Sequence, residues 1–319
     1  MNNADFFSSF GFSMSVTMPT VFMLVLGIVL RKRKMIDDKF TGQATKIIFM
    51  ITLPFLLFLN IISNPVDYRS QLLPILASIV GTLILFVSAE LFAAKYIPEK
   101  QERGTFVQSV YRGNNGILGL ALCINAYGEA GLAPASIYAA ATIFLFNVLG
   151  VITLSRSFAR GKVSWWEVLK NVVKNPLIIA IVLGYIVNVL ELSLPKTLLT
   201  TGNYLASMTL PLALICTGAS IRIKGSFFSS SVVMWGSFAR VLIAPIFMVI
   251  VGKLFGLSGM QMGILFLMAA TPMATVVYTM VRGMGGDGTN AANVIALTTL
   301  GAIITSSLGL MILTQLGWV

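Results

Sequence analysis

Long apolar runs separated by short polar segments make up most of the chain. Ten of them reach the length of about 17 to 25 residues that a helix needs to cross the hydrocarbon core of a bilayer. These runs lie at 12–30, 41–63, 72–95, 105–126, 133–155, 175–192, 197–220, 229–252, 259–282 and 289–315. The pattern therefore predicts an all-α polytopic membrane protein with ten transmembrane helices.

The composition agrees with this pattern. Hydrophobic residues make up 57% of the 319 residues and charged residues only 10%, whereas about a quarter of the residues in a soluble domain are charged. The first ten residues contain Asp5 and no lysine or arginine, so they lack the basic flank of a cleaved signal peptide. We expect the first span to be kept in the mature protein.

The positive charges orient the predicted helices, because lysine and arginine stay in cytoplasmic loops. Sixteen of them lie in odd-numbered connections, and only Arg69, Lys196 and Lys253 lie in even-numbered ones. Both termini are therefore predicted to lie outside the cytoplasm. The net charge of +11 is mostly this topology signal, and it also suits contact with anionic membrane lipids. It does not indicate a nucleic-acid partner.

The chain also contains a weak internal repeat. A shift of 157 residues superimposes sparse prolines and glycines: Pro19 and Gly27 on Pro176 and Gly184, and "TLP" at 52–54 on "TLP" at 209–211. Each half holds five predicted spans, so the second half enters the membrane in the opposite direction, as in many secondary transporters. The predicted organisation is a first repeat at 1–155, a cytoplasmic connecting loop at 156–174 and a second, inverted repeat at 175–319.

The same shift aligns two helix-breaking centres. "GNNG" at 113–116, in span four, falls on "ATPM" at 270–273, in span nine, with Asn115 on Pro272. Glycine, asparagine and proline all disfavour continuous helix, and irregular backbone at this depth is tolerated only inside protein or beside water. The sequence thus predicts two broken helices, four and nine, that cross with half-helix amino termini facing each other. Such ends suit an anionic group.

An alternative interpretation is open for these centres. Many membrane helices contain proline and glycine kinks, and asparagine side chains hold neighbouring helices together. The matching position of the two breaks in the two halves is what favours a binding site.

Five segments resemble the auxin efflux carrier family, which includes the plant PIN-formed auxin carriers and bacterial permeases for malate and malonate. They are "ITLPFLLFLNI", "GNNGILGLAL", "KNPLIIAIVLG", "MTLPLALICTGASI" and "AATPMATVVYTMVRGMGGDG", and the resemblance covers nearly the whole chain. It implies a scaffold domain of helices 1, 2, 6 and 7, a transport domain of helices 3–5 and 8–10, dimerisation through the scaffold, and an elevator-like alternation of access.

The family's span-four asparagine corresponds to Asn114 and its span-nine proline to Pro272. Where relatives often carry proline before that asparagine and at the end of the motif, this chain has Gly113 and Ala121. The long hydrophilic loop of plant members is missing, which indicates a compact prokaryotic member in the bacterial inner membrane.

Polar and charged residues within the spans are candidates for substrate contact. The substrate-binding candidates are Asn114, Asn115, Thr271, Pro272, Arg240, Thr52, Pro54, Thr209, Pro211, Thr275 and Tyr278, and the helix-breaking candidates are Gly113, Gly116 and Pro272. Arg240 either attracts a carboxylate or pairs with Glu90. Arg112 either contacts substrate or extends toward the cytoplasmic interface. Asn147 and Asn293 are further polar candidates, and each hydroxyl or proline alone also suits helix packing.

Several chemistries are excluded or disfavoured. The chain contains no histidine, which excludes HExxH metalloproteases and serine–histidine pairs, and it has no phosphate-binding loop. Cys123 and Cys216 fall within spans as small buried residues. We expect no enzyme activity, no cofactor and no bound metal. The coupling ion is open: a proton, sodium, or none in a uniporter driven by membrane potential.

The resulting hypothesis is a secondary transporter of small organic anions, either mono- or dicarboxylates or auxin-like acids, that works by an elevator mechanism. A sodium-coupled symporter of a larger organic anion, similar to bile-acid symporters, is the alternative within transport. An anion channel or membrane sensor is the alternative outside it.

Overall fold

The structure, a computed structural model, describes residues 3–63, 71–158, 166, 174, 176–221, 230–283 and 286–319, and all its elements are helices. In chain order they are α1 (Asn3–Lys32), α2 (Asp38–Ile47), η1 (Ile48–Thr52), α3 (Leu53–Ser63), α4 (Leu72–Tyr96), α5 (Lys100–Tyr111), η2 (Asn115–Gly119), α6 (Leu120–Ser157), α8 (Pro176–Val189), α9 (Lys196–Ser220), α10 (Ser231–Phe238), η3 (Ala239–Ile243), α11 (Ala244–Leu254), α12 (Gly259–Ala269), α13 (Val276–Gly283) and α14 (Thr289–Gln315). The η elements are short stretches of π-helix. The predicted all-α class is confirmed.

Seven helices in the described ranges are long and apolar enough to cross a membrane, and two further apolar helices are shorter. The ten predicted spans and the inverted repeat stay predictions. One reason for the lower number is α6, which runs through parts of predicted spans four and five and bends at Gly128, where φ is 61°. Most of the predicted loop at 156–174 lies outside the described residues.

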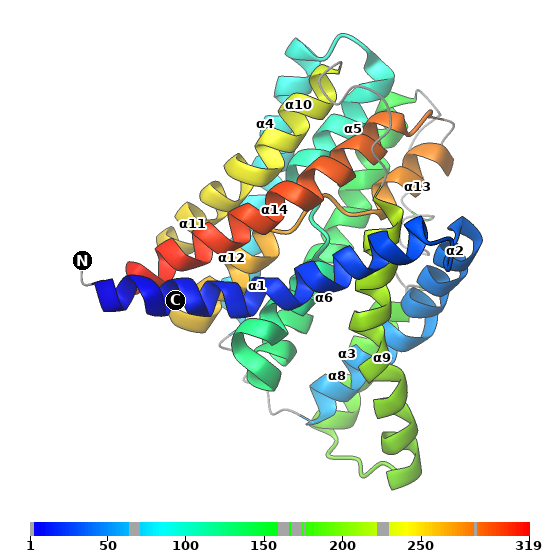
Figure 1. The fold of residues 1–319 in the computed structure, drawn as a ribbon, viewed down its shortest axis with the longest axis vertical. Coiled ribbons are helices and arrows are strands. Elements are labelled where there is room, and N and C mark those ends of the chain that lie inside the picture. Colours follow the sequence, from blue (N-terminus) through cyan, green and yellow to red (C-terminus); the bar gives the residue numbers. More distant parts are fainter. Residues whose placement is uncertain are drawn as a thin grey trace.

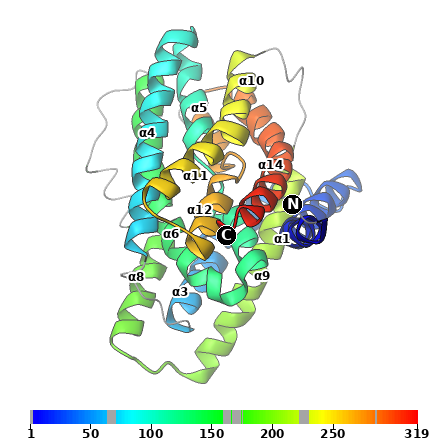
Figure 2. The ribbon, with the colours of Figure 1, turned by 90° about the vertical axis from the view of Figure 1, so that its left-hand side faces the viewer.

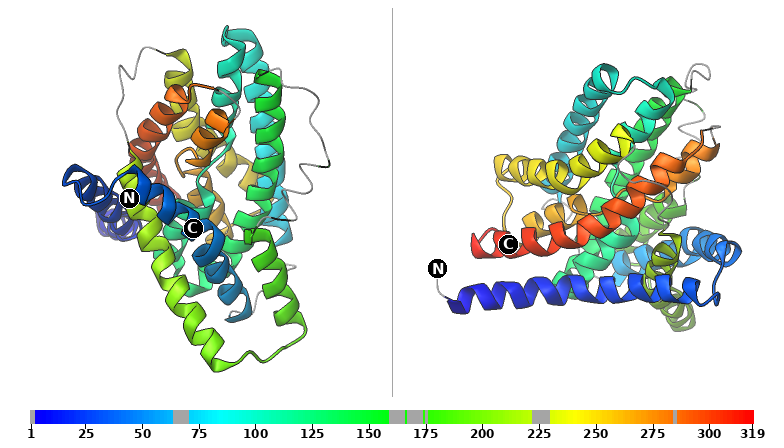
Figure 3. Two further views of the ribbon diagram at one scale, coloured as in Figure 1. Left: turned by 90° about the vertical axis from the view of Figure 1, so that its right-hand side faces the viewer. Right: turned by 45° about the horizontal axis from the view of Figure 1, so that its top comes forward.

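The helices pack in two groups (Figures 1 and 2). In one group α1 packs on α9, α9 on α3 and α3 on α8, with α2 against α9, while α4, α5, α6 and α10 to α14 form the other group. α1 joins the groups because it also packs along α14 and α6, and Figure 3 shows the long α1 and α14 side by side. The first residues of α1 and the last of α14 lie at the same end of the molecule.

The contact between α1 and α9 depends on two glycines. A Cβ atom built at Gly27 would overlap the carbonyl of Ile215, and one built at Gly218 would overlap the carbonyl of Leu24. Small residues let membrane helices approach closely, and backbone atoms on the opposite side have no rotamer with which to give way. These glycines therefore fix the distance between α1 and α9.

We expect Gly218→Ala to destabilise the protein by about 1–3 kcal/mol, because the added methyl group has to push two backbones apart. Gly42→Ala is the control, since Gly42 lies in α2 and a methyl group added there would have no atom within 4 Å, while alanine favours helix. The thermal midpoint of purified protein in detergent measures both effects. Equal midpoints for the two variants would contradict the close-packing argument.

Candidate functional site

Two helices are broken at the centre of the molecule, and the broken segments are joined by main-chain hydrogen bonds. α5 ends at Tyr111 and α12 at Ala269, while the chain resumes helix at Asn115 in η2 and at Val276 in α13. Between them, the Asn114 amide donates to Pro272 O (2.9 Å) and the Ala274 amide donates to Arg112 O (3.0 Å). We call this pair of non-helical segments, 112–114 and 270–275, the crossing.

The sequence explains why helix cannot continue here. Pro272 has no amide hydrogen and disfavours helical backbone at the residue before it. Gly113 is required by close approach: a Cβ atom there would overlap the Thr271 hydroxyl and lie 2.8 Å from Asn115 Oδ1 and 2.9 Å from Arg240 Nη2. The crossing thus depends on a proline in one segment and on a residue without a side chain in the other.

Arg240 satisfies the carbonyl ends of both broken helices. From η3 its guanidinium donates to Thr271 O (2.8 Å), to Val110 O (3.2 Å) and to Ala269 O. Only 3% of the residue is exposed, and it forms no ion pair with a described residue. The predicted alternative of a pair with Glu90 is wrong in this structure, because Glu90 instead lies 3.4 Å from Arg156.

Hydroxyl and amide side chains complete the support of the crossing. Asn115 Nδ2 donates to Thr142 Oγ1 (3.0 Å) on α6. The Thr271 hydroxyl lies 3.2 Å from Asn115 Oδ1, and the Met273 amide donates to Thr298 Oγ1 (3.1 Å) on α14. All of these partners belong to the helix group of α4, α5, α6 and α10 to α14.

A cavity of about 410 Å³ borders the crossing, within the size range of small-molecule sites. Its polar part consists of the crossing and its neighbours: Arg112, Gly113, Asn114, Asn115, Gly116, Asn147, Lys174, Ala274 and Thr275. Its apolar walls come from Phe49, Met50, Ile143, Phe146, Pro176 and Val276. A few convergent polar groups in an apolar pocket are typical of a ligand site.

Arg112 gives this cavity a buried positive charge. Its guanidinium donates to Gln108 Oε1 (3.1 Å), Phe146 O (2.9 Å) and Asn147 Oδ1 (2.6 Å). All three acceptors are neutral, and no described carboxylate forms an ion pair with Arg112, which is 3% exposed. The predicted alternative that Arg112 extends to the membrane interface is therefore wrong. Its charge is compensated by no fixed anion among the described residues.

Two further features of the cavity favour a negative ligand. The Asn114 Nδ2 group is buried without a hydrogen-bond partner among the described residues. In addition, residues at the amino-terminal ends of η2 and α13 line the cavity, and the first amide groups of a helix have no intrahelical acceptors and carry partial positive charge. A carboxylate has the charge and the acceptor oxygens that these groups lack.

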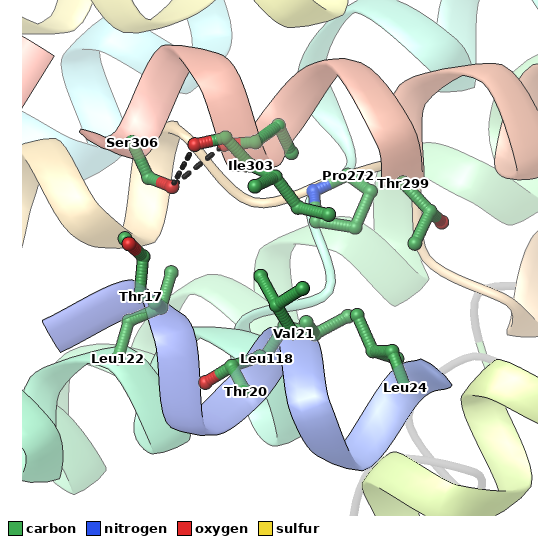
Figure 4. A pocket seen from close by; sticks show the side chains of 11 residues that line it. Thr17, Thr20, Val21, Leu24, Leu118, Leu122, Pro272, Thr299, Ile303 and Ser306 are labelled. Carbon is green, nitrogen blue, oxygen red and sulfur yellow. Dashed lines mark hydrogen bonds between the residues drawn. The ribbon is translucent and has the colours of Figure 1, made fainter. Parts of the chain in front are cut away.

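A second cavity meets the crossing at a different residue, Pro272. It has about 20 Å³, room for about one water molecule. Figure 4 shows it between α1 and α14, with Thr17, Thr20 and Val21 facing Ile303 and Ser306. Beside it, the Ser307 hydroxyl donates to Thr17 Oγ1 (2.9 Å), so α1 and α14 are in direct contact here.

The remaining predicted site residues are placed as follows. Thr271 and Arg240 take part in the hydrogen bonds that support the crossing. Thr275 and Gly116 line the large cavity, and Gly116 lies inside η2. Thr52, Pro54, Thr209, Pro211 and Tyr278 are not among the residues that line the large cavity. Thr209 is fully buried and donates to Leu205 O (3.1 Å) within α9, and Tyr278 is 42% exposed. Asn293 is buried on α14.

Sequence reasoning misses several cavity residues. Phe49 and Met50 lie within one turn before the predicted Thr52, and Lys174 precedes the "NPL" with which the sixth predicted span begins. Lys174 begins the family-like segment "KNPLIIAIVLG", which is a signal, whereas Phe49 and Met50 lie just before such a segment. Apolar side chains in an apolar chain carry no pattern that separates a cavity wall from a lipid-facing surface.

Comparisons with known proteins agree with a transport role. The family described as "Membrane transport protein" matches residues 12–310. An uncharacterized transporter of Methanocaldococcus jannaschii is 24% identical over 321 aligned positions, which cover 96% of this chain and 98% of that protein.

We expect Gly113→Ala to destabilise the protein by about 1–3 kcal/mol, because the methyl group overlaps atoms of both broken segments. Gly116→Ala is the neighbouring control. Its methyl group would lie 3.3 Å from the flexible end of the Ile143 side chain, which has room to turn. Thermal midpoints in detergent compare the two, and a stable Gly113→Ala variant would show that the crossing is looser than described.

Proposed function

The chain belongs to the auxin efflux carrier family of membrane transport proteins, and we propose that it is a secondary transporter of small organic anions, either mono- or dicarboxylates or auxin-like acids. It is a multi-pass membrane protein. The observation that carries the anion proposal is the buried charge of Arg112 in the large cavity, which no carboxylate of the described residues compensates.

The cavity supplies complementary groups at short range. A guanidinium binds carboxylate oxygens through directional, charge-assisted hydrogen bonds. Beside Arg112, the Asn114 side-chain amide offers a donor that has no partner in the described part of the chain, and helix amino termini add partial positive charge. Lys174, at the edge of the same cavity, adds a second cation for a ligand with a second carboxylate. The apolar walls suit the carbon skeleton of the ligand.

The packing of the helices supports an elevator-type mechanism. The side chains that support the crossing, from Thr142, Arg240 and Thr298, all belong to the group of α4, α5, α6 and α10 to α14. In the proposed mechanism that group would slide as a unit along α1, α3, α8 and α9, and this motion would break none of these hydrogen bonds. The sliding group would act as the transport domain and the group of α1, α3, α8 and α9 as the scaffold, through which we expect a homodimer to form.

The charge distribution supports an orientation. Lys174 lies in a predicted cytoplasmic connection, so the large cavity would open toward the cytoplasm and both termini would lie outside. We place the protein in the bacterial inner membrane, in contact with anionic lipids. The contact between α1 and α14 near Ser307, beside the small cavity at Pro272, would close the path to the exterior.

The direct test is a current measurement on the purified protein in liposomes on a solid support. The panel is malate, malonate, succinate, lactate and indole-acetate, each with and without proton and sodium gradients. A saturable transient current for one of these acids supports the proposal and identifies the coupling ion. If none of these acids evokes a current, and a thermal unfolding transition shows that the protein is folded, the proposed substrate class is contradicted.

Asn114→Ala is expected to abolish the anion-evoked current while the thermal midpoint stays near that of the wild type. The side-chain amide nitrogen has no internal partner to lose among the described residues, and the main-chain bonds of Asn114 remain. Asn203→Ala, at an exposed asparagine of α9, is the control. An unchanged current and affinity in Asn114→Ala would remove Asn114 from the site.

Arg112→Lys is expected to raise the half-saturating anion concentration about tenfold, because an ammonium keeps the charge but not the planar donor pair. Arg112→Gln is expected to abolish the current. Arg156→Lys is the control, since that side chain is largely exposed at the end of α6. If Arg112→Gln transported anions with wild-type affinity, the anion proposal would lose the observation that carries it.

A further inference from the structure

Arg240 occupies the point where two carboxyl-terminal helix ends converge. α5 ends at Tyr111 and α12 at Ala269, and carbonyls of both ends accept hydrogen bonds from the same guanidinium. The last carbonyls of a helix lack intrahelical partners and carry the negative end of the helix dipole. Two partial negative charges therefore meet at one buried cation.

Carbonyls of this kind have a second use in transporters. At discontinuous helices, unwound carbonyls and half-helix carboxyl-terminal ends coordinate the coupling sodium ion. In this chain, three such carbonyls, of Val110, Ala269 and Thr271, are engaged by Arg240. Arginine keeps its charge under all relevant conditions.

Around Arg240, the three carbonyls are already engaged by its guanidinium, and the positive charge of the guanidinium opposes a second cation beside it. The cavity that borders Arg240 has about 20 Å³, about the volume for one water molecule. On its other side the guanidinium is packed so closely that a Cβ atom at Gly113 would lie 2.9 Å from Nη2. Arg240 is also not part of the lining of the large cavity, so it serves the crossing and not the ligand directly.

We propose that Arg240 is a positioning residue that takes the place of a coupling cation: its guanidinium neutralises the carbonyl ends of α5 and α12 and holds the crossing, so that transport needs no sodium. The inference rests on the proposed function for its transport consequence. The claim that Arg240 supplies a fixed cation at the crossing rests only on its hydrogen bonds to the three carbonyls. Among the possible coupling schemes, this proposal excludes sodium coupling and leaves a proton-coupled carrier or a uniporter.

The test compares the wild type with Arg240→Ala and Arg240→Lys. Thermal midpoints are measured while sodium chloride replaces choline chloride at constant ionic strength, and L-malate-evoked currents are recorded from liposomes in the same two salts. Arg103→Ala is a matched control, because Arg103 also donates to a carbonyl at a helix end, Ile97 O (2.8 Å) after α4, but away from the crossing.

The wild type and Arg103→Ala are expected to show the same midpoint and the same current in both salts. Arg240→Ala in choline is expected to have a lower midpoint and a current reduced at least about tenfold, since a charged group's hydrogen bonds to buried carbonyls are lost. A saturable rise of the Arg240→Ala midpoint with sodium, or recovery in Arg240→Lys, supports the proposal, because either restores a positive charge at the carbonyls.

Three results would overturn the proposal. They are a saturable, sodium-specific rise of the wild-type midpoint, an Arg240→Ala variant equal to the wild type in choline, and an Arg240→Ala defect that neither sodium nor lysine at position 240 repairs. If Arg240→Ala yields no folded protein, Arg240→Lys is examined alone. A folded Arg240→Lys shows that position 240 needs a positive charge, and an unfolded one shows that it needs the shape of arginine. Silence of the wild type toward malate counts against the proposed function only, because the midpoints still decide the role of Arg240.

Discussion

The structure depends on one constraint: two membrane helices are interrupted inside the molecule, where freed backbone groups that do not face the large cavity have only protein partners. Each unpaired polar group in that setting costs several kcal/mol. The chain meets the constraint by pairing the two broken segments with each other, through Asn114 and Ala274, by capping the carbonyl ends with Arg240, and by placing threonine hydroxyls beside the rest. The buried donor of the crossing that stays without a partner among the described residues, Asn114 Nδ2, belongs to a residue that lines the large cavity. At the large cavity, a side-chain donor of the crossing is therefore left for a ligand.

The two breaks also separate charge. Both carboxyl-terminal ends meet Arg240, and both amino-terminal ends border the large cavity. A second buried arginine, Arg112, adds a full charge on the cavity side and has only neutral acceptors. Because a buried charge without a counter-ion is costly, an incoming carboxylate gains more from Arg112 than it would from an arginine already held by a glutamate. The proposed affinity for anions rests on this absence of a fixed partner among the described residues.

Sequence reasoning locates the breaks but not the partners. Proline, glycine and asparagine are sparse in an apolar chain, so their positions at 113–116 and 270–273 stand out. The role of Arg240 cannot be predicted from the sequence, because its three partners are backbone carbonyls. Every residue has a backbone carbonyl, so no residue type marks these partners. The sequence places Thr52 at the cavity, whereas Phe49 and Met50 line it; the rotation of a helix that is apolar on all sides is not encoded in its periodicity.

The hydrogen bonds that hold the crossing determine what is able to move. They come from α5, α6, α12, α14 and η3, and none comes from α1, α3, α8 or α9 among the described residues. Across the boundary between the two groups, hydroxyl and amide contacts of α1 recur, such as Ser307 to Thr17 (2.9 Å) and Asn125 to Val16 O (2.9 Å). Such neutral contacts contribute about 1 kcal/mol each, less than the cost of exposing the arginines of the crossing to hydrocarbon. Motion at this boundary is therefore less costly than motion within the crossing, and a bound anion would travel with Arg112 and Asn114 as part of one body.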